Sequence, residues 1–169
     1  MSVTQDMNAI SVAQTRILKC PGVTTDLSPA TVGTTLYTIT GDPVHVLYMF
    51  GLVSTVIGAG AAVPSLQLTA NAAYGAGVAP IAAASASIAN VAAGTIVGMT
   101  GVAATQLVIV GTLGIRNTGE ANGLWGPAEY MLMVPGVIQI INTVSAVSGI
   151  IDWYLMYQPV SPRSHVAVR

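Results

Sequence analysis

Short stretches in which hydrophobic and polar residues alternate recur along the chain, separated by glycine and proline. Residues 36–40, Leu-Tyr-Thr-Ile-Thr, alternate with a period of two, which places successive side chains on opposite faces of a strand. Gly41-Asp42-Pro43 follows and has turn chemistry, because glycine accepts positive φ and proline fixes φ. The apolar residues 44–53 then predict a longer, mostly buried strand.

The same pattern predicts the remaining strands. They cover residues 63–69, 106–110, 130–134, 137–142 and 149–157. In the last of them, one face carries Ile151, Trp153, Leu155 and Tyr157, and the other carries Asp152, Tyr154 and Met156. Many short strands punctuated by glycine and proline are typical of an all-β fold, and we expect a single β-sandwich or barrel-like domain.

Residues 70–104 are rich in alanine, glycine and small polar side chains. Their alanine content alone allows a helix over residues 79–93. Pro80 and Gly94 bound that stretch, however, and serine and asparagine dilute it. We therefore expect short strands joined by loops in this region.

The two ends of the chain differ from its middle. Residues 1–35 show little periodicity beyond Ile17-Leu18, so we interpret them as an extended N-terminal arm that orders when it binds a neighbour. Residues 36–160 form the expected β domain. The segment 161–169 is expected to be a peripheral C-terminal tail.

Charged residues are scarce: they make up 7% of the chain, against 53% hydrophobic residues, and the net charge is -1. An average soluble domain is roughly a quarter charged. No basic field exists to hold nucleic acid, so we expect no nucleic-acid partner. A surface of uncharged polar residues suits large, permanent interfaces, where a charge removed from water would need a partner.

High hydropathy raises the possibility of a membrane protein. No Asp, Glu, Lys or Arg stands between Asp42 and Arg116. A helical span needs about 20 consecutive, mainly apolar residues, whereas Pro64, Pro80 and Pro135 interrupt the candidate runs. Residues 1–15 also lack the basic start and apolar run of a secretory signal. We expect synthesis in the cytoplasm and no membrane partner, with a small integral membrane protein as the alternative.

Residues able to do chemistry are few and dispersed. His45 and His165 are the only histidines, and Cys20 is the only cysteine, which rules out an internal disulfide and a thiolate metal cluster. Glu120 and Glu129 flank a loop and resemble the paired carboxylates of glycosidases, but two solvated loop charges explain them better. No phosphate-binding loop or nucleophile elbow occurs. We predict no catalytic, cofactor or metal site.

Candidate residues for contact with a partner come from the aromatic and apolar positions. Large aromatic side chains dominate many interfaces, although each can equally be an ordinary core residue. The predicted interface residues are Ile17, Leu18, Trp125, Trp153 and Tyr157. Asp152 is expected to face solvent or a partner charge, because an unpaired buried carboxylate is costly.

Three segments carry a resemblance to a known group. Residues 149–160, Gly-Ile-Ile-Asp-Trp-Tyr-Leu-Met-Tyr-Gln-Pro-Val, resemble the closing strand of small tailed-bacteriophage virion proteins, with Val160 where that group has leucine. Residues 36–57 and 87–101 are similar to two earlier segments of the group, in the same order. The resemblance covers most of residues 36–160 and leaves the arm without a counterpart.

This resemblance implies a capsid decoration (cement) protein with a β-sandwich or barrel fold. Such a protein binds the outer surface of the phage capsid and stabilises contacts between capsomers, commonly as a homotrimer. The implied partners are the major capsid protein and further copies of the chain, and the implied location is the exterior of the virion. A tail-tube or tail-associated virion protein is the alternative within the same class.

Overall fold

The computed structural model describes residues 14–24, 33–60, 63–98, 108–111, 131–142 and 148–169. The strands are β1 (Arg16–Thr24), β2 (Thr34–Thr40), β3 (Val44–Thr55), β4 (Pro64–Ala70), β5 (Val78–Ala82), β6 (Ile96–Gly98), β7 (Val108–Gly111), β8 (Met131–Met133), β9 (Gly136–Asn142), β10 (Ile150–Pro159) and β11 (His165–Val168). A short 3-10 helix, η1 (Ala72–Tyr74), connects β4 to β5.

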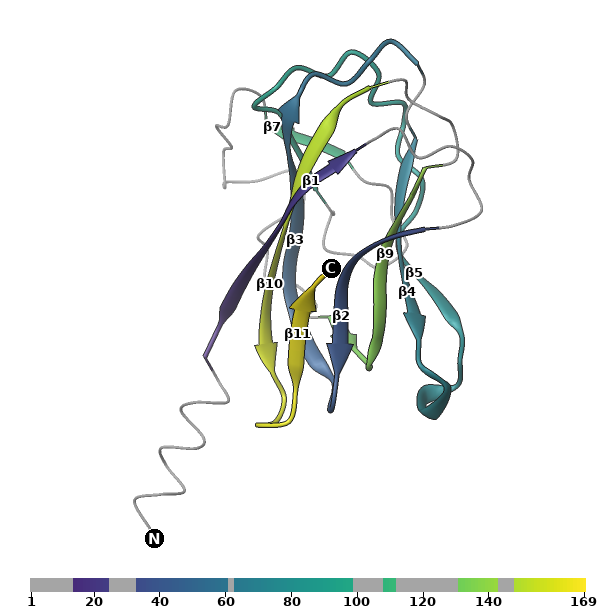
Figure 1. Ribbon diagram of the computed structural model, residues 1–169, viewed down its shortest axis with the longest axis vertical. Coiled ribbons are helices and arrows are strands. Elements are labelled where there is room, and N and C mark those ends of the chain that lie inside the picture. The colour runs from purple at the N-terminus through teal and green to yellow at the C-terminus, as the bar shows by residue number, and fades with distance from the viewer. Residues whose placement is uncertain (1–13, 25–32, 61–62, 99–107, 112–130, 143–147) are drawn as a thin grey trace, which may run out of the picture.

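The strands form two antiparallel sheets that face each other as a sandwich (Figure 1). Sheet A has the order β1-β10-β3-β6-β7, with β8 also paired to β3. Sheet B has the order β11-β2-β9-β4-β5. The expected all-β sandwich is therefore confirmed.

The core lies between the sheets and follows the period-two pattern. Along β10, Ile151, Trp153, Leu155 and Tyr157 are buried, and the alternate residues are partly exposed, as the sequence predicted. The Tyr37 hydroxyl, on β2, donates a hydrogen bond to the Trp153 carbonyl at 2.8 Å. This bond joins the two sheets through the middle of the core.

Most predicted strands are present. The segments 36–40, 44–53, 63–69, 137–142 and 149–157 match β2, β3, β4, β9 and β10, and 130–134 is represented by β8. The described part of 70–104 contains η1, β5, β6 and loops, with no α-helix over 79–93. For 106–110, β7 covers 108–110, and 106–107 lie outside the described residues.

The expected arm contains a strand that belongs to the sandwich. β1 pairs with β10 along the edge of sheet A, so the boundary at residue 36 is wrong for residues 16–24. A register shift between Cys20 and Val23 places Leu18, Cys20 and Val23 toward the core at spacings of two and then three. That shift breaks the period-two pattern, which is why the sequence showed no strand here.

The expected peripheral tail also contains a strand. β11 pairs with β2 at the edge of sheet B, and Val166 is buried in the core. The turn before it is fixed by Arg163, whose guanidinium donates to both Asp42 carboxylate oxygens at 3.0 and 3.1 Å. Four residues are too short to show a clear period, so the sequence did not reveal this strand.

The two sides of the sandwich differ. On one side, β1 lies near β11, and Arg169 donates hydrogen bonds to the carbonyls of Pro21 and Gly22 at 3.4 Å. On the other side, β5 of sheet B and β8 of sheet A flank an apolar opening. In the part of the chain that is described, no helix is long and apolar enough to span a membrane.

Candidate interaction surface

The outer face of sheet A gathers apolar and aromatic side chains from three adjacent strands. The register places Met156 beside both Ile17 and Tyr48, and Tyr154 beside Phe50. Because the inward positions of these strands fill the core, these five side chains lie on the opposite face. Ile17 is exposed there, Phe50, Tyr154 and Met156 are partly exposed, and Tyr48 is only 5% exposed. We call this set, Ile17, Tyr48, Phe50, Tyr154 and Met156, the outer-face stripe.

Aromatic contacts hold the middle of the stripe in one arrangement. The rings of Phe50 and Tyr154 stack with centroids 4.8 Å apart and an interplanar angle of 7°. Tyr48 lies 5.5 Å from Phe50, tilted by 31°. Such pairs contribute about 0.5–1.5 kcal/mol beyond their buried area, so they preorganise the surface. Ile17 remains 62% exposed at the edge of the stripe.

An ion pair between Lys19 and Asp152 lies at the border of the stripe, and its two opposite charges cancel. The Lys19 ammonium lies 2.8 Å from an Asp152 carboxylate oxygen and 5.6 Å from the centre of the Tyr154 ring. The Gly22 amide donates to the other carboxylate oxygen at 2.8 Å. The hydrogen bond from Lys19, and then that from Gly22, lower the pKa of Asp152; the same carboxylate raises the pKa of Lys19. The expectation that Asp152 meets solvent or a partner charge is confirmed.

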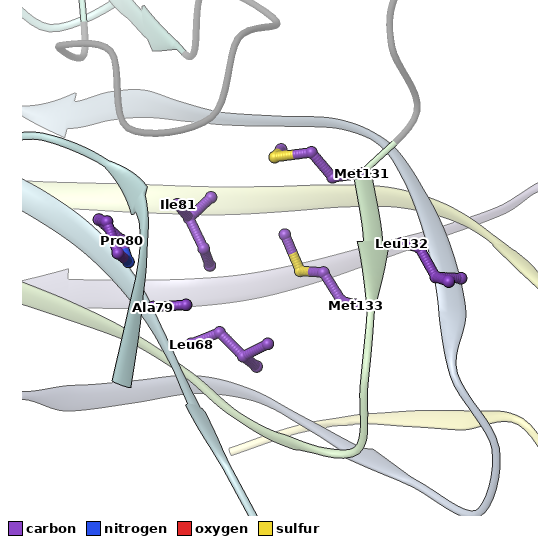
Figure 2. Close-up of a pocket in the computed structure, with 7 residues that line it drawn as sticks. All are labelled: Leu68, Ala79, Pro80, Ile81, Met131, Leu132 and Met133. Carbon is purple, nitrogen blue, oxygen red and sulfur yellow. The ribbon is translucent and has the colours of Figure 1, made fainter. Parts of the chain in front are cut away.

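A groove of about 290 Å³ opens between β5 and β8. It is lined by Leu68 and by the segments 79–81 and 131–133, none of which carries an ionisable side chain. Met131 and Met133 extend from β8 toward Ile81, whereas Leu132 points to the opposite side of the strand (Figure 2). The groove therefore offers apolar contacts and no acid, base or nucleophile.

The two histidines and the cysteine lie on three different strands. His45 is partly exposed on β3, and His165 is exposed on β11. Cys20 is buried, and this burial raises the pKa of its thiol, so the thiol is protonated at neutral pH. Among the residues described, no group of three His, Cys, Asp or Glu side chains can hold a metal ion. Glu120 and Glu129 lie outside the described residues.

The five predicted interface residues have different locations. Ile17 is exposed in the stripe, while Leu18 is partly buried against the core. Trp153 and Tyr157 are 0% and 2% exposed, so both are core residues and neither side chain can meet a partner. Trp125 lies outside the described residues.

The prediction missed Tyr154 and Met156, although the sequence held a signal for them. Asp152 marks the outer face of β10, so the residues directly before and after it belong to the buried face. Tyr154 and Met156 follow Asp152 at spacings of two. They, rather than Trp153, were therefore the surface candidates. The contribution of Phe50 and Tyr48 depends on strand register, which the sequence did not specify.

No family model, curated protein or solved structure matches this chain.

Proposed function

We propose that this chain is a structural, non-enzymatic subunit that binds the outer surface of a tailed-bacteriophage capsid as a decoration, or cement, protein. The observation that carries the proposal is the outer-face stripe, in which exposed Ile17 and the partly exposed Phe50, Tyr154 and Met156 form a preorganised apolar surface on a domain with few charges. Apolar side chains gathered on the surface of a domain typically mark a site of protein–protein contact.

The energetics of the stripe suit a permanent interface. Burying an unpaired charge at an interface is costly, but Lys19 and Asp152 already neutralise each other at the border. Tyrosine and phenylalanine give large contact area and lose few rotatable bonds on binding. One face of the sheet presents the side chains of the stripe together, so a partner surface of complementary shape can cover all of them at once.

The capsid as partner is supported by the resemblance of residues 36–160 to small phage virion proteins. The proposed partner is the major capsid protein, at the virion exterior, where the chain stabilises contacts between capsomers. A homotrimer at three-fold positions multiplies each weak contact by the copy number. Affinity then arises from many modest contacts rather than from one deep site.

The test is sedimentation with undecorated, expanded capsids of the parent phage. The unmodified chain is expected to co-sediment at micromolar concentration. Ile17→Asp introduces a charge into the stripe at a 62% exposed position and is expected to weaken binding at least tenfold. Val56→Asp, at a 53% exposed position beyond the end of β3, is the matched control and is expected to bind normally.

Three results would contradict the proposal. Failure of the unmodified chain to co-sediment excludes the decoration role. Rings or tubes formed by the purified chain in electron micrographs favour a tail-tube subunit instead, and partitioning of the chain into detergent favours a membrane protein.

A further inference from the structure

The groove between β5 and β8 is an apolar site on the side of the sandwich opposite β1 and β11. Ala79 and Pro80 are exposed at its rim, and Met131 is only partly buried, so a segment of chain can enter from solvent. Ile81 and Met133 are buried and form its floor (Figure 2). Because Pro80 cannot donate a backbone hydrogen bond, added strands are disfavoured at this edge. Binding here must come from apolar side chains.

The groove lies level with the start of β1. Arg16 pairs with Tyr157, Tyr157 with Val46, and Val46 with Met131, so one row of residues crosses sheet A from β1 to the groove. Three strand spacings correspond to roughly 14 Å. The chain before β1 therefore leaves the domain at the same height as the groove, but on the other side of the sheet.

β1 begins at the edge of sheet A that lies away from the groove. Thr15 accepts a hydrogen bond from Gln158 at 3.0 Å, which fixes the start of β1 against the end of β10. The described part of β1 runs outward beyond the sandwich at this end (Figure 1). Residues 10–14 span only about 13 Å when extended, which is too short to pass round the edge of sheet A and cross its roughly 14 Å to the chain's own groove.

The sequence before β1 matches the chemistry of the groove. Residues 7–13, Met-Asn-Ala-Ile-Ser-Val-Ala, carry no charge, and Ile10 and Val12 are spaced two apart with Ser11 between them. In an extended segment these two side chains share one face. Residues 7–13 span roughly 23 Å when extended, and Ile10 lies about 13 Å along the chain from Gln14, so the second copy packs directly against the start of β1.

We propose that residues 7–13 of one copy dock in the groove of a second copy, with Ile10 and Val12 against the methionines of β8. Arm and groove are different surfaces, so the contact is head-to-tail and closes into a ring when the rotation between copies allows it. This inference goes beyond the proposed function, because it concerns association of the chain with itself without a capsid.

Crosslinking between two variants, each with one added cysteine, tests the proposal. Ile10→Cys chain and Ala79→Cys chain are mixed during refolding and oxidised with copper phenanthroline. We expect the covalent dimer to form at least ten times faster than when Ala167→Cys chain replaces Ala79→Cys chain. Ala167→Cys is the control, because it also replaces an exposed alanine, but on β11 at the opposite edge of sheet B. The unmodified chain reports the background from buried Cys20.

Three results would overturn the proposal. The first is crosslinking of the mixed pair no faster than the control. The second is a purely intramolecular crosslink in the Ile10→Cys/Ala79→Cys double variant. The third is unchanged association of a chain lacking residues 2–13, measured by analytical ultracentrifugation after circular dichroism has shown a folded β spectrum. Each experiment omits the capsid, so its failure is distinguishable from failure of the decoration role.

Discussion

Gly51 determines how closely β3 and β10 pack around the largest core side chain. It is the register partner of Trp153, and a Cβ at this position would lie 2.5 Å from Ile151 Cγ2 and 3.3 Å from the indole ring. Glycine is required here because the Ile151 methyl group occupies the position of a side chain and the indole ring of Trp153 lies close beside it. The small residue on β3 and the large residue on β10 therefore complement each other.

Gly51→Ala is expected to lower the free energy of unfolding by about 1–3 kcal/mol, because the added methyl overpacks the core. Urea denaturation followed by tryptophan fluorescence measures the change. Gly77→Ala is the matched control, since a Cβ there meets nothing closer than 3.9 Å, and its effect is expected to stay within about 1 kcal/mol. Equal effects of the two substitutions would contradict this account of the packing.

Asp152 gives a prediction about pH. Its pKa is lowered by Lys19 and the Gly22 amide, so the carboxylate stabilises the fold at pH values above its ordinary pKa of about 4. This contribution decreases as the pH falls from that value through the lowered pKa. Asp152→Asn is expected to cost about 0.2–1 kcal/mol at pH 7, and the difference from the unmodified chain should disappear in strong acid. A difference that persists below pH 2 would contradict the prediction.

At the residue scale, the sequence predicted which side chains of β10 share a face. It did not by itself say that Trp153 lies inside, because period two assigns residues to faces without saying which face is buried. Adding the cost of burying Asp152 settles the orientation. The stacking of Phe50 on Tyr154 joins residues far apart in sequence, and only the register of β3 against β10 brings them together.

At the scale of elements, the predictions succeeded where a strand is long and regular and failed at the two ends. β1 was missed because its inward residues change spacing at the register shift, and β11 because it has only four residues. Both are edge strands, and both contribute buried side chains. The domain therefore includes residues 16–24 of the expected arm and residues 165–168 of the expected tail.

Val166 tests whether β11 is part of the cooperative fold. Val166→Ala removes two methyl groups at a position that is 3% exposed, and is expected to cost about 1–3 kcal/mol in urea denaturation. Val160→Ala, at a 44% exposed position in the preceding turn, is the control and is expected to stay within about 0.5 kcal/mol. An equally small effect at residue 166 would show that the tail is peripheral after all.

At the scale of the whole molecule, the sequence predicted the sandwich class but not its open and closed sides. Strand order depends on pairing between distant segments, such as β1 with β10, and local patterns do not encode it. The outer-face stripe and the groove are products of that order. Both were therefore beyond sequence reasoning, even though the sequence predicted β3, β8 and β10, which contribute most of their residues.

The scarcity of charge predicts how the proposed association responds to salt. With a net charge of -1 and an apolar stripe, attraction to the capsid does not rely on long-range electrostatics. Co-sedimentation is expected to change less than threefold between 50 and 500 mM sodium chloride, roughly the range over which surface charges become screened. A loss of tenfold or more would indicate that charged residues carry the contact.

The strand order also constrains how a ribosome-bound chain can fold. In the described structure, β1 pairs only with β10, and β2 lies between β9 and β11. The first two strands to be synthesised therefore wait for partners that begin at residue 136 and end at residue 168. The β4–β5 hairpin can form early, but both sheets are completed only after residue 168 has left the ribosome. The aromatic face of sheet A is therefore assembled late, when β10 joins β1 and β3.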